Sequence, residues 1–200
     1  MAVLGSGSGT NLQAMLDHPV VGPWIALVVS DRGDAGALER ARARGVAAVL
    51  VDPEAHPDRA AYDRAVLDVL GSHDIGFVAL AGFMRILTPD LVRAYAGRML
   101  NLHPSLLPSF PGAHGVRDAI DWGVKITGVT VHLVDEELDH GPIVAQEPVA
   151  VLAGDDWDSL EERIHEAEHR IYPKALKALV EGRLKVEGRI VHVLEEPADE

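Results

Sequence analysis

Short apolar runs and amphipathic stretches alternate along the first half of the chain. The apolar runs predict buried strands, and apolar residues that recur at helical spacing predict helices between them. We expect strands at residues 1–4, 25–29, 47–51 and 75–81 and from residue 99, and helices from residue 12 and over 35–44, 59–70 and 89–96. Strands that alternate with helices favour an α/β, doubly wound fold with a mostly parallel sheet and flanking helices.

The second half of the chain has a different pattern. Residues 126–134 alternate as a strand, and an acidic turn leads to another strand over 142–149, which predicts a hairpin-like return. A long amphipathic helix is expected over 156–179, interrupted at Pro173. A C-terminal hairpin over 184–186 and 190–193 follows, and we expect the chain to be frayed from Pro197 onward. The sequence contains no long linker, so we expect a single domain over residues 1–200, with a phosphate-binding N-terminal half.

Composition narrows the class of protein. The chain has 200 residues, 48% of them hydrophobic and 24% charged, as in a globular protein. The formal net charge of -13 argues against general nucleic-acid binding and against an anionic membrane surface. The absence of cysteine excludes a disulfide framework, a thiol nucleophile and a cysteine zinc site. No secretory segment or long apolar run is visible, so we expect a soluble cytoplasmic protein with no membrane contact.

A glycine-rich loop over residues 5–11 joins the first strand to the first helix. A loop in this place directs free backbone N–H groups, assisted by the helix dipole, toward an anion. Thr10 occupies the third glycine slot of a dinucleotide fingerprint, and the loop does not fit the nucleoside triphosphate pattern either. A single phosphate monoester is the better hypothesis, and a merely flexible turn is the alternative.

A second loop, over residues 82–87, follows the apolar run at 75–81 and carries a single cation, Arg85. Such a loop at the carboxyl end of a strand suits a flat, part-aromatic ligand with an anionic end. Ordinary loop packing with Arg85 in solvent is the alternative.

Asn101 and His103 stand two residues apart at the end of the strand that begins at residue 99. Side chains alternate along a strand, so both point to the same face. An amide and a titratable imidazole together can stabilise an oxyanion and transfer a proton, although both could simply cap a strand end. Both loops and this pair follow strands, so we expect them to meet at one edge of the sheet, where ligands bind in such folds.

Seven stretches, in order over almost the whole chain, resemble one family: residues 6–13, 80–87, 101–108, 110–114, 128–132, 138–143 and 168–173. The family is that of the folate-dependent glycinamide ribonucleotide formyltransferases. The resemblance implies a Rossmann-like formyltransferase fold, with a folate-binding and catalytic C-terminal half. It also implies transfer of a formyl group from 10-formyltetrahydrofolate to the amine of glycinamide ribonucleotide in purine biosynthesis, with no metal.

The resemblance also implies roles for individual residues. The implied catalytic set is Asn101, His103 and Asp139. The substrate phosphate would bind Gly9, Thr10 and Asn11, and the ribose would bind Glu168. The folate would contact Met84, Arg85, Ile86, Leu87 and the loop at Asp139. His114 and Thr130 could orient Asp139 and His103.

Two histidines differ from what the resemblance leads us to expect. His140 stands where the family often has a smaller residue, and His165, near a phosphate contact of relatives, could make binding pH-sensitive.

Three other functions are the alternatives. Methionyl-tRNA formyltransferase usually carries a tRNA domain, and formyltetrahydrofolate hydrolase carries a regulatory domain and lacks the phosphate-type loop. A phosphate-binding module without catalysis would make the set Asn101, His103 and Asp139 accidental. The expected partners are the two small-molecule substrates, in a monomer or homodimer.

Overall fold

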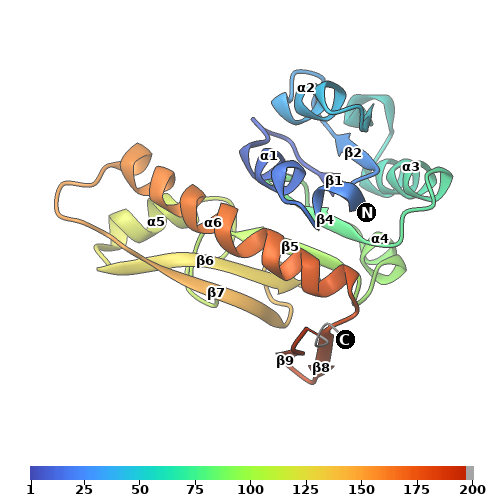
Figure 1. Cartoon of the computed structure of the whole chain (residues 1–200). Helices are drawn as coiled ribbons and strands as arrows, with labels where there is room; N and C mark the ends of the chain where they lie inside the picture. The colour runs from blue at the N-terminus through green and yellow to red at the C-terminus, as the bar shows by residue number, and fades with distance from the viewer. Residues whose placement is uncertain (197–200) are drawn as a thin grey trace.

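A single mixed sheet of nine strands organises the molecule (Figure 1). The computed structural model describes residues 1–196, so the frayed end expected from Pro197 lies outside the described residues. The strand order is β3-β2-β1-β4-β5-β6-β7-β9-β8. The predicted fold class, a mostly parallel sheet with flanking helices, is confirmed.

The first five strands form the parallel part of the sheet. They are β1 (Ala2–Leu4), β2 (Leu27–Ser30), β3 (Ala47–Leu50), β4 (Val78–Leu80) and β5 (Met99–His103). All five had been expected from the apolar runs, and the observed strands at 27–30 and 78–80 differ from the predicted ranges by a few residues. Parallel pairing brings the carboxyl ends of β1, β4 and β5 to one edge of the sheet.

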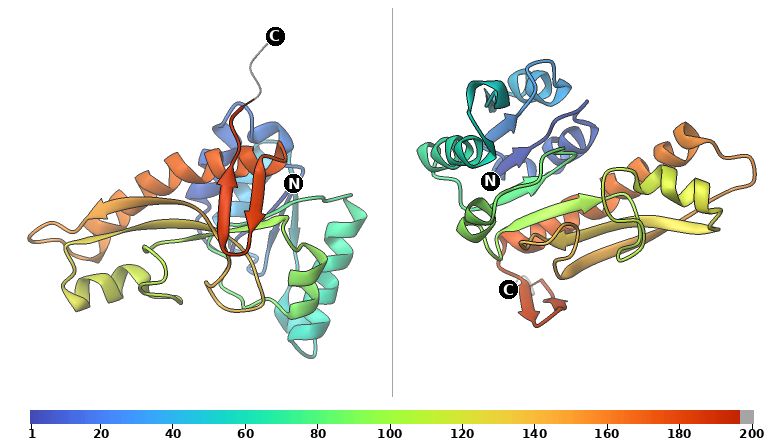
Figure 2. Two further views of the ribbon diagram at one scale, coloured as in Figure 1. Left: turned by 90° about the horizontal axis from the view of Figure 1, so that it is seen from below. Right: turned by 180° about the vertical axis from the view of Figure 1, so that it is seen from behind.

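Helices cover both faces of this parallel part (Figure 2). One face packs against α1 (Thr10–Asp17), α2 (Gly36–Ala43) and α6 (Trp157–Val180), and the other against α3 (Arg59–Ser72) and α4 (Pro89–Ala94). The alternation along β1 explains how: Val3 belongs to the first core and Leu4 to the second. Two short 3-10 turns, η1 (Gly22–Trp24) and η2 (Pro53–Ala55), lie in the connections.

The sheet continues as an antiparallel part after β5. The strand β6 (Ile126–Leu133) runs antiparallel to both β5 and β7 (Ile143–Ala150), so the hairpin-like return is confirmed. The helix α5 (Gly115–Trp122) precedes β6. The predicted C-terminal hairpin is also present as β8 (Leu184–Glu187) and β9 (Ile190–Val193), and β9 joins the sheet beside Ile143 of β7.

The long helix α6 corrects one prediction. We expected an interruption at Pro173, but α6 runs unbroken from Trp157 to Val180. Proline removes one backbone donor, and tertiary packing outweighs that loss here because Tyr172, next to it, is fully buried. The Tyr172 hydroxyl donates to the carbonyls of Leu80 (2.8 Å) and Leu100 (3.1 Å), which fixes α6 over the ends of β4 and β5.

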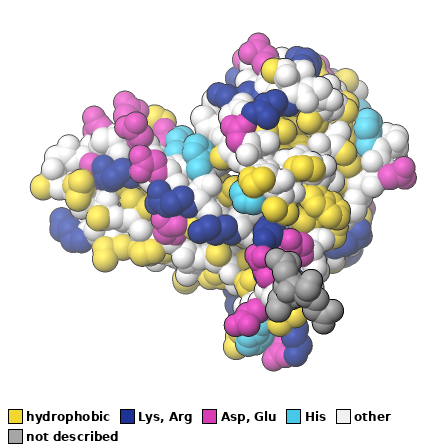
Figure 3. All heavy atoms as spheres, viewed as in Figure 1, with side chains coloured by type: hydrophobic (Ala, Val, Ile, Leu, Met, Phe, Trp, Pro, Cys, Tyr) yellow, Lys and Arg dark blue, Asp and Glu magenta, His cyan; other side chains and the backbone are white. Residues whose placement is uncertain are grey.

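The surface shows no concentration of one charge on the face drawn in Figure 3, where acidic and basic side chains are interspersed. Among the helices of residues 1–196, none combines the length and the apolar character that crossing a bilayer requires.

Candidate active site

A cavity of about 610 Å³ opens at the edge where β1, β4 and β5 end. That volume suits a small-molecule ligand. Its walls come from all three predicted segments, through Asn11, the loop at 82–86 and the pair Asn101 and His103. The helix α6 completes the wall with Ile164, His165 and Glu168. The expected convergence on one edge is therefore observed.

Two residues of α2 hold the glycine loop by donating hydrogen bonds to its carbonyls. The carbonyl of Gly7 accepts from the N–H of Ala37 (3.3 Å), and the carbonyl of Ser8 accepts from Nε of Arg40 (2.9 Å). Gly9 has a φ of +76°, and a Cβ there would lie 2.7 Å from Cα of Ala37, so glycine is required. The carbonyls of Gly7 and Ser8 are thus held toward α2. The loop then leads into α1, whose first amides have no partner within the helix. The sequence had given no sign of the Arg40 contact.

Of the residues expected to hold phosphate, Asn11 lines the cavity, whereas Gly9 and Thr10 stand at the start of α1 beside it. The Asn11 amide donates to Oε2 of Glu168 at 2.7 Å. Glu168 is buried, and this burial raises the pKa of its carboxyl, although the bond from Asn11 and nearby His165 act against the rise. His165 Nε2 lies 3.8 Å from Oε2 of Glu168. Asn11 and Glu168 thus meet at one end of the cavity.

The side chains of the loop at 82–87 point in different directions. Met84 and Ile86 are exposed in the cavity wall, and the N–H of Met84 donates to Oγ of Ser6 (3.0 Å). The guanidinium of Arg85 stacks over the ring of Tyr62, with 4.6 Å from Cζ to the ring centroid, and lies 4.0 Å from Asp31.

The structure therefore does not leave Arg85 in solvent, the alternative considered from the sequence. Its charge is directed toward the protein, where Asp31 and Tyr62 compete with any anionic ligand for it. Leu87 packs with the second core rather than in the cavity. Backbone groups of this loop are consequently better placed than the Arg85 side chain to receive a ligand.

Asn101 and His103 lie on the same face of β5, as predicted. His103 is buried, and its Nε2 is 2.8 Å from the carbonyl of Phe110. A carbonyl only accepts hydrogen bonds, so Nε2 carries the hydrogen. The other ring nitrogen, Nδ1, lies 3.5 Å from Oδ2 of Asp139.

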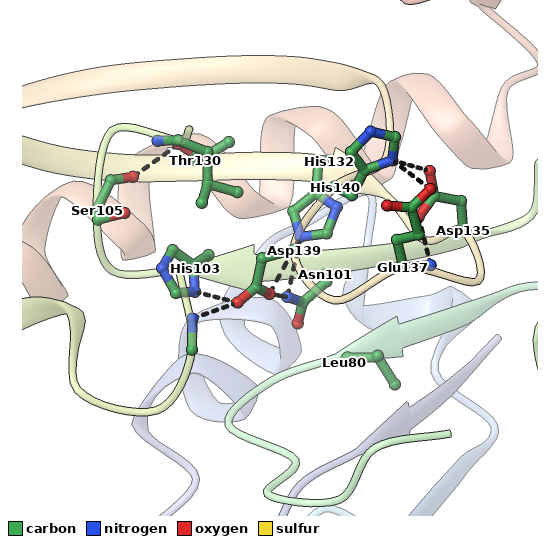
Figure 4. A network of polar contacts seen from close by, with 12 residues as sticks. Leu80, Asn101, His103, Ser105, Thr130, His132, Asp135, Glu137, Asp139 and His140 are labelled. Carbon is green, nitrogen blue, oxygen red and sulfur yellow. Dashed lines mark hydrogen bonds and ion pairs between the residues drawn. The ribbon is translucent and has the colours of Figure 1, made fainter. Parts of the chain in front are cut away.

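Asp139 joins the predicted catalytic residues into one network (Figure 4). Its Oδ2 accepts from the N–H of Gly112 (2.7 Å), and its Oδ1 accepts from Nδ2 of Asn101 at the longer distance of 3.4 Å. Its side chain is only 7% exposed, and its backbone has a φ of +50°. Buried carboxylates need donors, and a strained non-glycine backbone needs support from its surroundings.

His132, to which the sequence analysis gave no role, completes this network. It stands opposite Asn101 in the β5–β6 register, and Nδ2 of Asn101 donates to its Nε2 at 3.0 Å. Its Nδ1 lies 2.9 Å from the carbonyl of Leu133, which places the hydrogen on Nδ1 and leaves Nε2 as the acceptor. Burial lowers the pKa of His132, so the imidazole is neutral at pH 7. The alternation of β6 was the sequence signal that could have identified His132, and its pairing with Asn101 is seen only in the structure.

The roles expected for Thr130 and His114 in orienting Asp139 and His103 stay predictions, and Thr130 stands opposite His103 in the β5–β6 register. The Thr130 hydroxyl donates to the carbonyl of Ser105 (2.7 Å) and accepts from the N–H of Leu107 (3.0 Å) and from Gln146. It therefore holds the proline-rich loop after β5. His114 lines the cavity at the start of α5.

Nothing in residues 1–196 groups three or more histidine or acidic side chains as a metal site would. The cavity instead combines amide and imidazole donors with a buried carboxylate. Such a set can stabilise an oxyanion and move a proton without a covalent intermediate.

Three comparisons place this chain in a family. Residues 1–176 match the family model described as formyl transferase. A glycinamide ribonucleotide transformylase structure from Symbiobacterium toebii superposes with a TM-score of 0.93 at 48% identity, covering 97% of this chain and 93% of that one. The Mycobacterium tuberculosis phosphoribosylglycinamide formyltransferase is 46% identical over 192 residues, 94% of this chain and 88% of that protein.

A longer relative matches over the same part of the chain. The bovine trifunctional purine biosynthetic protein adenosine-3 is 43% identical in an alignment of 201 positions, which covers 98% of this chain but only 20% of that protein. The chain thus spans about a fifth of the trifunctional protein's length and most of the length of the single-function relatives. These matches confirm the enzyme class indicated by the sequence resemblance: the chain belongs to the formyl transferase family.

Proposed function

We propose that the protein transfers the formyl group of 10-formyltetrahydrofolate to the primary amine of glycinamide ribonucleotide, yielding the formylated nucleotide and tetrahydrofolate. The observation that carries the proposal is the contact of Asn101, His103 and Asp139 at the floor of one cavity that also reaches Asn11 and Glu168. Relatives similar over most of their length have names for this activity, which supports the proposal.

The two donors of the site would stabilise the tetrahedral oxyanion formed when the amine attacks the formyl carbon. One hydrogen of the Asn101 amide is fixed by His132 at 3.0 Å, and the other has only the long 3.4 Å bond to Asp139. That second hydrogen is available to a developing oxyanion. The Nε2 hydrogen of His103, now on the Phe110 carbonyl at 2.8 Å, would bond to the same oxygen and then be transferred to the leaving folate nitrogen.

Asp139 would manage the proton that the attacking amine loses. Its carboxylate faces Nδ1 of His103 at 3.5 Å, on the opposite side of the ring from the hydrogen that Nε2 carries. A proton taken from the amine, directly or through a water, can therefore be balanced by one given to the folate nitrogen. The attack forms the new carbon–nitrogen bond, and collapse of the intermediate breaks the bond from carbon to the folate nitrogen.

The two substrates would occupy opposite walls of the cavity. We place the substrate phosphate at the amides of Gly9, Thr10 and Asn11 and the ribose at Glu168. The folate would lie against Met84 and Ile86, with polar contacts to the backbone of the loop at 82–87. The reacting carbon then falls between the walls, at Asn101 and His103.

The test is a spectrophotometric assay of 10-formylfolate consumption with and without glycinamide ribonucleotide. We expect consumption only with the amine, and a loss of orders of magnitude in His103→Ala. Arg40→Ala, which removes a contact with the glycine loop, should instead raise the KM for glycinamide ribonucleotide. Consumption without the amine would indicate a hydrolase, and substrate binding without turnover would indicate a binding module.

We also propose a single domain over residues 1–200, a cytoplasmic location and a monomeric or homodimeric state. The pH-sensitive role suggested for His165 likewise stays a prediction. Its ring stacks on that of His169 with 6.3 Å between centroids, and burial together with His165 lowers the pKa of His169. This arrangement supports the idea that protonation at this end of the cavity alters substrate binding.

A further inference from the structure

The turn of the C-terminal hairpin contacts the loop that carries Asp139. Arg189 stands in the two-residue turn between β8 and β9. Its Nη2 donates to the carbonyl of His140 at 2.6 Å, and its Nη1 lies 3.0 Å from Nε2 of the same residue. One guanidinium thus holds both the backbone and the ring of the residue next to Asp139. The family model ends at residue 176, before this hairpin begins.

The protonation state of His140 follows from its partners. Its Nδ1 lies 2.8 Å from Oδ2 of Asp135, and since a carboxylate only accepts, Nδ1 carries the hydrogen. Its Nε2 is then free to accept from Arg189, which has only donors. The charged groups that face the His140 ring are Asp135, Glu137, whose Oε1 is 4.0 Å from Nδ1, and Arg189. The chain from Asp135 through His140 to Arg189 is complete only while the imidazole is neutral.

The loop between β6 and β7 needs such a restraint. Asp139 has a φ of +50°, and a Cβ on Gly141 would lie 1.8 Å from the carbonyl of Leu133, so the backbone on both sides of His140 is tightly constrained. Two contacts of the Asp139 carboxylate are long: 3.4 Å to Nδ2 of Asn101 and 3.5 Å to Nδ1 of His103. A small displacement of this loop would break both.

We propose that Arg189 is a positioning residue for the reaction: through His140 and Asp135 it holds the loop in the conformation that presents Asp139 to His103 and Asn101. Arg189 does not touch the cavity itself and acts only through His140. The C-terminal hairpin is thereby part of the catalytic architecture. The expected kinetic effect rests on the proposed formyl transfer. The expected effect on the conformation of the loop can be measured without the substrates.

The first test measures backbone hydrogen exchange of residues 136–141 in the full chain. Arg189→Ala should raise the exchange rates there about tenfold or more, because the loop loses both contacts with the hairpin. The matched control is Lys185→Ala, which removes a cation from the same hairpin, in an exposed pair with Glu187, and should leave the loop unchanged. Unchanged exchange in Arg189→Ala would overturn the proposal, whatever the protein's substrates are.

The second test is kinetic. We expect Arg189→Ala to lower kcat by about tenfold, with the KM for glycinamide ribonucleotide nearly unchanged, because misplacing a catalytic group affects the chemical step. Arg189→Lys should recover part of the rate, since an ammonium can keep one of the two bonds. If the wild type showed no formyl transfer, the proposed function would be wrong. The exchange measurement would then still decide whether Arg189 holds the loop that carries Asp139.

The split between kcat and KM, together with partial rescue by lysine, separates positioning from a merely structural role. A kcat for Arg189→Ala within about twofold of wild type would contradict the proposal.

Discussion

The two ends of the cavity differ in the groups that they present: side chains at one end and backbone amides at the other. At the end that we propose is catalytic, side chains are buried and bonded to one another: the side chains of His103 and Asp139 are 5% and 7% exposed, and His132 is fixed on both ring nitrogens. At the end proposed for the substrate phosphate, the glycine loop offers backbone amides, and the Asn11 side chain is bonded to Glu168 of α6.

This difference separates the expected consequences of mutation. Side-chain donors held rigidly before the substrate arrives stabilise charge that develops only in the transition state, so their loss should lower kcat. Backbone amides that hold a phosphate contact substrate and transition state alike, so disturbing them should raise the KM. The predictions that follow test this division.

The largest effect is expected for Asp139→Asn. The amide has the size of the carboxylate and can still accept from Gly112, but it cannot take a proton from the amine. We expect kcat to fall by about 10²–10⁴-fold while the KM for glycinamide ribonucleotide changes little. The control is Glu136→Gln, an exposed carboxylate of the same loop that pairs with Arg93. An increase in KM larger than the decrease in kcat would break the division between the two ends.

A smaller effect on the same end is expected for His132→Ala. Without the acceptor Nε2, the Asn101 amide is free to rotate, and the donor aimed at the oxyanion is no longer fixed. We expect kcat to fall by about tenfold to a hundredfold. His132→Gln should recover part of this loss, because its amide can accept from Asn101 and donate to the carbonyl of Leu133. Equal losses in both variants would show that bulk, not the hydrogen bond, matters at this position.

The catalytic end also shows what could and could not be predicted from the sequence. The alternation of side chains put Asn101 and His103 on one face, and the order of strands and helices put them at the edge shared with the glycine loop. Both expectations depend on local periodicity and on parallel topology. The β5–β6 register that brings His132 to Asn101 depends on pairing between strands distant in the chain.

Two other features could not be predicted from the sequence, because they depend on contacts between residues distant in the chain. The predicted break at Pro173 was wrong because burial of Tyr172 under the sheet outweighs one lost hydrogen bond. The contact between Arg189 and His140 joins residues 49 positions apart through two exposed turns, which carry no periodic signal. Motif spacing is informative where one element carries the chemistry, and less so where two elements share it.

At the substrate end, Gly9→Ala should affect both stability and binding. A Cβ at this position would lie 2.7 Å from Cα of Ala37, and the φ of +76° disfavours alanine. We expect the free energy of unfolding to fall by about 1–3 kcal/mol and the KM for glycinamide ribonucleotide to rise, with kcat less affected. Urea unfolding and steady-state kinetics measure the two effects.

The same loop supplies the control for this variant. A Cβ on Gly7 would meet nothing within 4 Å, so Gly7→Ala should change neither stability nor KM appreciably. If both alanine variants behaved alike, the shape of the turn at Gly9 would not be what creates the phosphate site.

The smallest effect is expected for Glu168→Gln, and it concerns stability as well as binding. Burial raises the pKa of Glu168 above its ordinary value of 4.5, so between these two pKa values the folded protein holds a proton that the unfolded chain has released. The wild type therefore loses stability as the pH rises through this window, whereas glutamine has no proton to lose. The free energy of unfolding of the variant, relative to wild type, should increase from about pH 4.5 upward.

Urea unfolding of both proteins at about pH 5 and pH 7.5 measures this difference. Glu166→Gln, on an exposed part of the same helix, is the control and should show no such trend. Glutamine can still accept from Asn11, so the KM for glycinamide ribonucleotide should rise only a few-fold while kcat stays nearly constant. A variant that binds less well yet gains stability with pH would mean that the buried charge is kept for the substrate, since the fold alone is better without it. A relative stability that falls with pH would instead mean that Asn11 and His165 stabilise the ionised carboxylate by more than its burial costs.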